Sequence, residues 1–142
     1  MYKEILLAVD LNDIECQRKA IDTTISLARA FGARVHVHTV LPDFGMPIVA
    51  SYFPKGFESK ALETAKQALH DFVKETFPED LEVLQILGQG GIYQEILSGA
   101  KQIGADLIVM ASHRPGYEDY LIGPNASRVV RHAKCSVMVV RS

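Results

Sequence analysis

The chain has 142 residues, enough for one domain with a single core, and 48% of them are hydrophobic, which excludes wholesale disorder. The formal net charge of −2 leaves no basic surplus to hold a nucleic-acid backbone, so we expect no nucleic-acid partner. No apolar run approaches the roughly 20 residues that cross a bilayer, and the amino terminus lacks a signal-peptide pattern, so we expect a soluble, cytoplasmic protein without a membrane partner.

Short apolar segments alternate along the chain with segments of helical periodicity. The apolar segments are nearly continuous, which is typical of strands that are covered on both faces in a parallel sheet. The five predicted strands are Glu4–Asp10, Arg34–Leu41, Leu81–Leu87, Asp106–Ala111 and Ser136–Arg141.

The segments between the predicted strands carry an apolar residue every three or four positions, as a helix packed on a sheet requires. Five strands alternating with four helices predict an α/β fold, in which a single domain over residues 1–142 is built on a doubly wound five-stranded parallel sheet. A flavodoxin-like sheet with another strand order remains the alternative. The helical periods end before Gly32, at Thr76 before Pro78, at Ile103 before Gly104, and at Ala133.

Ligands of open parallel sheets bind beyond the carboxyl ends of the strands, where the strand order reverses. The informative loop at that edge is 111–125, which contains glycine and leads into the short fourth helix. Backbone N–H groups and the dipole at a helix start favour phosphate, and His113 and Arg114 add donors. Neither a P-loop nor a GxGxxG motif is present, so neither a P-loop NTPase nor a Rossmann dinucleotide site is predicted.

The opening ILLAVDLND and the tail VMASHRPGYEDYLIGPNASRVVRHAKCSVMVVR resemble the universal stress protein family, and the element order is similar over essentially the whole chain. The resemblance implies an adenine-nucleotide α-hydrolase-like fold, and a stress-response or regulatory protein that binds ATP. It also implies a homodimer through the C-terminal strand. Mg²⁺ with the ATP and slow ATP hydrolysis stay open. The sequence does not predict a dedicated enzyme, a catalytic residue or a metal site.

The phosphate motif of the family is G-x2-G-x9-G-[S/T], and this chain departs from it. Ala111 and Arg114 replace the first two glycines, and Pro124 replaces Ser or Thr. Eight residues instead of nine separate Arg114 from Gly123. The variant resembles the subgroup related to enterobacterial universal stress protein F. Pro124 lacks both an N–H and a hydroxyl, so two phosphate donors are missing, and the charge of Arg114 would have to compensate.

The resemblance also implies a set of ligand-binding residues. Asp10 meets the adenine or ribose, Ala8, Val9 and Val40 line the base, and Gly90 lies near the adenine side. The residues expected around the ribose and phosphates are Met110, Ala111, His113, Arg114, Gly123, Asn125 and Ala126.

Several of these patterns have a structural alternative. Asp10 ends a strand and is also suited to cap the following turn. His36 and His38 permit a metal pair, but without a third ligand ordinary hydrogen-bonded histidines are favoured. The long segment Pro42–Gly56 fits a functional flap or a lid that packs on itself. The two cysteines, Cys16 and Cys135, lie outside any CxxC pair and predict no disulfide framework.

Two other functions stay open beside nucleotide binding. One is an enzyme on a related fold, such as an ATP-pyrophosphatase or a nucleotidyl transferase. The absence of SGGxDS and HxGH motifs counts against it. The other is a dimeric interaction module that has lost its ligand, which the replacements at Ala111, Arg114 and Pro124 suggest.

Overall fold

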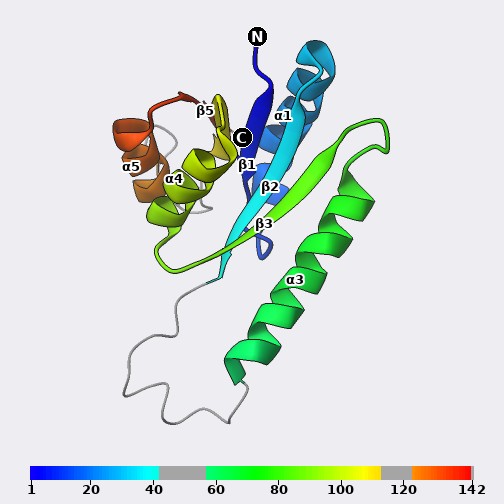
Figure 1. Cartoon of the computed structure of the whole chain (residues 1–142), viewed down its shortest axis with the longest axis vertical. Helices are drawn as coiled ribbons and strands as arrows, with labels where there is room; N and C mark the ends of the chain where they lie inside the picture. Colours follow the sequence, from blue (N-terminus) through cyan, green and yellow to red (C-terminus); the bar gives the residue numbers. More distant parts are fainter. Residues whose placement is uncertain (42–56, 113–122, 142) are drawn as a thin grey trace.

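The computed structural model describes residues 1–41, 57–112 and 123–141, and in this part of the chain strands and helices alternate as predicted (Figure 1). The strands are β1 Glu4–Ala8, β2 Arg34–Leu41, β3 Val83–Gln89, β4 Leu107–Ala111 and β5 Ser136–Val140. The helices are α1 Arg18–Phe31, α3 Phe57–Thr76, α4 Ile92–Ile103 and α5 Pro124–His132, and a short 3-10 helix, η1, spans Glu15–Gln17.

The five strands form one sheet in the order β3-β2-β1-β4-β5, and all neighbours are parallel. The chain winds outward from β1 through β2 to β3 and then returns to the other side of β1 for β4 and β5. This order confirms the doubly wound sheet and excludes the flavodoxin-like alternative. The reversal lies between β1 and β4, whose register pairs Leu6 with Ile108.

Helices cover both faces of the sheet (Figure 1). On one face, α1 and α3 pack on buried residues of β1 and β2 such as Ile5 and Val37. On the other, α4 and α5 pack on Leu6 and Ile108, with Ile96 as the most buried apolar residue of α4. Because side chains alternate along a strand, the nearly continuous apolar runs serve both cores at once.

Several predicted strand boundaries shift by one or two residues: β1 ends at Ala8 instead of Asp10, β3 ends at Gln89 instead of Leu87, β4 begins at Leu107 instead of Asp106, and β5 ends at Val140 instead of Arg141. Strand β3 begins at Val83 instead of Leu81, because the Leu81 N–H donates to the carbonyl of Pro78 in a turn at 3.2 Å. Helix α3 begins at Phe57, ahead of the predicted periodicity. The segment 42–56 lies outside the described residues, so neither interpretation of it is tested. Within the described ranges, no helix is long and apolar enough to cross a membrane.

Candidate functional site

A cavity of about 360 Å³ lies at the carboxyl ends of β1, β2 and β4, where the strand order reverses. Its position is the one that the topology of open α/β sheets assigns to a ligand. One part of its wall is apolar, from Ala8 and Val40 on the sheet to Ile92 and Ile96 on α4. The polar part comes from the loop after β1, from Ser112 after β4 and from the start of α5.

The cavity brings together nine of the twelve residues that the sequence predicted. Gly90 is not among the lining residues; with φ at 132°, it forms the turn between β3 and α4. His113 and Arg114 lie outside the described residues. The nine are Ala8, Val9, Asp10, Val40, Met110, Ala111, Gly123, Asn125 and Ala126.

Strand β1 is extended beyond the sheet by hydrogen bonds to β2. The Val9 N–H donates to the His38 carbonyl at 2.9 Å, and the Thr39 hydroxyl donates to the Val9 carbonyl at 2.9 Å. Thr39 and Val9 are both buried, so the two bonds are shielded from water. The chain is therefore fixed up to the residue that precedes Asp10.

Asp10 itself is held by the side-chain amide of Gln17. The Asp10 N–H donates to Gln17 Oε1 at 2.8 Å, and Gln17 Nε2 donates to the Asp10 carbonyl at 2.8 Å. The carboxylate Oδ1 accepts the Asn12 N–H at 3.0 Å, so Asp10 does cap the turn after β1. Among the described residues no group donates to Oδ2, and the side chain is exposed. A capping role and a ligand-binding role are therefore compatible.

The start of α5 has fewer free donors than an ordinary helix. The first four N–H groups of a helix lack partners within it, and here they belong to residues 123–126. The Gly123 N–H donates to the Ser112 carbonyl at 3.0 Å, and Pro124 at the first helical position has no N–H. In the described part of the chain no group accepts the N–H of Asn125 or Ala126, so the helix offers two backbone donors at the cavity wall.

His38 forms part of the cavity wall as a neutral ring. Burial lowers the pKa of His38 to about 4, against a smaller opposing hydrogen bond with the backbone of Glu95. The ring fits against α4 because position 99 is glycine, where a Cβ would lie 2.9 Å from His38 Nε2. No described group hydrogen-bonds Nδ1.

The neighbouring His36 is an ordinary hydrogen-bonded histidine. Its Nε2 lies 2.7 Å from Glu4 Oε2, at the opposite end of the sheet from the cavity. Burial raises the pKa of Glu4, but hydrogen bonds and charge from His36 and Arg34 outweigh it, so the net pKa is lowered. Among the described residues no cluster of three metal-ligating side chains occurs, so His36 and His38 do not form a metal pair with a third ligand there.

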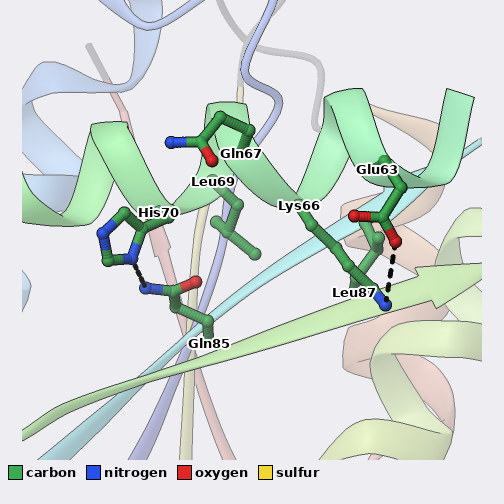
Figure 2. Close-up of a pocket in the computed structure, with 7 residues that line it drawn as sticks. All are labelled: Glu63, Lys66, Gln67, Leu69, His70, Gln85 and Leu87. Atoms are coloured by element: carbon green, nitrogen blue, oxygen red, sulfur yellow. Dashed lines mark hydrogen bonds and ion pairs between the residues drawn. The ribbon is translucent and has the colours of Figure 1, made fainter. Parts of the chain in front are cut away.

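A second hollow of about 520 Å³ lies between α3 and β3 (Figure 2). Four of its polar side chains form two pairs: Lys66 lies 3.9 Å from Glu63, and Gln85 lies 3.3 Å from His70. It contains neither a helix start nor the carboxyl ends of central strands. The chemistry of this hollow favours a solvated groove, and we take the cavity beside β1 as the candidate site.

Comparison with known proteins then places the chain in a family. The model of the universal stress protein family matches residues 1–141. The chain belongs to this family. Universal stress protein G of Escherichia coli O157:H7 and of Shigella flexneri is 31% identical over 143 residues, which cover 99% of this chain and 100% of the relative. The family prediction is thereby confirmed.

Solved structures share the fold of this universal stress protein. The structure of hypothetical protein MJ0577 superposes with a TM-score of 0.81 at 26% identity and covers 100% of this chain and 97% of that one. A universal stress protein from Archaeoglobus fulgidus in complex with dAMP has a TM-score of 0.62 at 22% identity, with 97% of each chain covered. At that identity the second structure supports the fold alone.

The sequence analysis of this universal stress protein missed several lining residues, among them Gln17, Thr39 and Ser112. Gln17 and Thr39 act on backbone groups of Asp10 and Val9, and Ser112 links β5 to the start of α5 through its own backbone. The one usable signal was the polar residue Ser112 directly after the apolar strand β4.

Proposed function

We propose that this universal stress protein binds an adenine nucleotide in the cavity at the carboxyl ends of β1 and β4. ATP is the ligand that the family resemblance implies. The observation that carries the proposal is the junction of an apolar wall, the Asp10 carboxylate and the free N–H groups of α5 in one cavity of about 360 Å³. Small-molecule sites of about 300–1,000 Å³ with a few convergent polar groups are usual in proteins.

The parts of a nucleotide match the parts of the cavity. The base would lie on the apolar wall near Ala8 and Val40, and Asp10 Oδ2 would accept a hydroxyl or amine proton. One phosphate would lie against the N–H groups of Asn125 and Ala126, where the helix dipole favours an anion. The universal stress protein from Archaeoglobus fulgidus was solved with dAMP, and we propose a ligand of the same class, a nucleoside phosphate, for this cavity.

Further phosphates would need a positive charge. None of the described lining residues is Lys or Arg, so the proposed contact of Arg114 with the β- or γ-phosphate would supply that charge. Any Mg²⁺ would enter with the triphosphate, because the described residues hold no metal-ligating cluster of their own. We propose a cytoplasmic stress-response or regulatory role, with ATP hydrolysis slow.

We also propose a homodimer through β5. In the described sheet β5 pairs only with β4, and Val137, Met138 and Val139 are half-buried. An apolar edge strand favours pairing with a second chain, and in a twofold dimer the β5 edges of the two chains cover each other.

A second candidate function is a dimeric interaction module without a ligand. It is favoured by the start of α5, where Gly123 and Pro124 together remove two of the four N–H donors. Calorimetric titration of the purified protein with ATP, ADP and AMP separates the two candidates. Saturable binding of any of the three supports the nucleotide site. No heat of binding up to millimolar nucleotide, with the dimer intact, favours the interaction module.

A further inference from the structure

The side-chain amide of Gln17 hydrogen-bonds the backbone of Asp10 in the way that a neighbouring strand does inside the sheet. It accepts the N–H and donates to the carbonyl of the same residue, both at 2.8 Å. Its Nε2 also donates to the carbonyl of Asp13 at 2.5 Å. One side chain thereby satisfies three backbone groups of the loop between β1 and α1.

Gln17 is placed for this task and not for capping its helix. It stands at the N-cap of α1, but its side chain makes no cap hydrogen bond. Gln17 is only 8% exposed, whereas Asp10 is exposed and Asp13 half-buried, so the amide hydrogen-bonds the loop from its buried side. All three residues line the cavity.

We propose that Gln17 is a positioning residue of the ligand site, which fixes the backbone of Asp10 so that its carboxylate faces the bound nucleotide. The inference rests on the proposed nucleotide binding. Without the amide, the three backbone groups would turn to water, and the loop would have to be ordered when the ligand binds. Any of these groups that water does not reach would stay unsatisfied, which costs more than the loss of the hydrogen bond alone.

The variant Gln17→Glu tests the inference through pH. The introduced carboxylate keeps an acceptor for the Asp10 N–H, but it cannot donate to the carbonyls of Asp10 and Asp13 and repels their oxygens. Protonation restores one O–H donor. The pKa of the introduced carboxyl should be raised because it is buried beside these oxygens.

The measurement is the dissociation constant of ATP and of AMP, from about pH 8 to about pH 5, for wild type and variants. We expect Gln17→Glu to bind about tenfold more weakly than wild type at the alkaline end and to approach wild type at the acidic end. Gln17→Ala should bind about tenfold more weakly at every pH, because it has no donor to recover. Gln67→Glu is the matched control: Gln67 is exposed on α3 and donates to Asp71 at 2.9 Å, so its variant should follow wild type throughout.

The outcomes separate the inference from the proposed function. If both Gln17 variants bind ATP and AMP as tightly as wild type does at every pH, Gln17 does not position the site, and the proposed nucleotide binding stands. A deficit of Gln17→Glu that is the same at every pH contradicts the donor role, because the O–H donor that protonation restores should restore binding. Circular dichroism in the same buffers checks that each variant is folded. Absence of binding in wild type overturns both proposals.

Discussion

Returning a donor to the start of α5 should strengthen nucleotide binding. Pro124→Ala restores one backbone N–H, and Pro124→Ser restores the N–H together with a hydroxyl. At present Asn125 and Ala126 are the two residues of the first turn with free N–H groups, because the Gly123 N–H is bonded to Ser112 at 3.0 Å. A third backbone donor would complete the set that a phosphate group meets at an ordinary helix start.

The magnitude follows from the hydrogen bond that is added. A hydrogen bond to a charged group contributes about 1.5–3 kcal/mol, which corresponds to about tenfold to a hundredfold in affinity. Position 124 is exposed, so water screens the contact, and we expect the lower end, about tenfold, for each variant. Folding stability should change in the opposite direction. Proline at the first helical position restricts the unfolded chain, and its loss should lower the free energy of unfolding by about 0.4–1 kcal/mol.

Calorimetry with ATP and AMP, and thermal unfolding without ligand, measure the two effects separately. Pro78→Ala is the control, since Pro78 follows α3 and does not line the cavity. It should lose stability without a gain in affinity. If both Pro124 variants are less stable but bind ATP and AMP as wild type does, the start of α5 does not hold phosphate, and the reasoning is refuted.

Asp10→Ala should weaken ATP binding by about 0.5–1.5 kcal/mol or more, and should weaken binding more than it weakens folding. The control Asp22→Ala, on the exposed face of α1, should leave ATP binding unchanged. Wild-type affinity of Asp10→Ala in calorimetry would leave Asp10 with a capping role only. Arg114→Ala should weaken ATP about tenfold or more and AMP little, because AMP lacks the β- and γ-phosphates; equal losses would count against the proposed contact. Val139→Lys should yield monomers in light scattering, and an unchanged dimer mass would remove β5 as the interface. Burial lowers the pKa of His38 to about 4, so between pH 6.5 and about 4 this histidine is protonated in the unfolded chain but not in the folded one, and the wild type loses stability as the pH falls. In His38→Gln this part of the pH-dependent loss of stability should be absent. Urea unfolding measures this, and an unchanged pH dependence would show that His38 does not cause the loss.

The fold was predictable because hydrophobic periodicity determines it. Strands covered on both faces must be apolar throughout, and the helices between them need only one apolar stripe, so the two alternate visibly in the sequence. The error at Leu81 has the same origin. An apolar residue in a turn can pack against the core just as a strand residue does, and periodicity does not distinguish the two.

The lining of the candidate site was predictable where topology and family motif agree, as at Asp10 and Gly123. It was not predictable at Gln17 and Thr39, because each acts by holding backbone groups of a residue elsewhere in the chain. Such bonds depend on how the loop folds and leave no periodic trace in the sequence. Gly90 shows the converse: a glycine in a family-like position serves the turn after β3 and does not line the cavity.

The most direct test of nucleotide binding at this site is an NMR titration of isotope-labelled protein with ATP and with AMP. We expect the backbone amide signals of Asp10, Asn125 and Ala126 to shift and saturate. The signals of Gln85 and Leu87, in the hollow between α3 and β3, should stay in place. Saturating shifts at Gln85 and Leu87 instead, or no shifts at Asp10, Asn125 and Ala126 with millimolar nucleotide, would contradict the account.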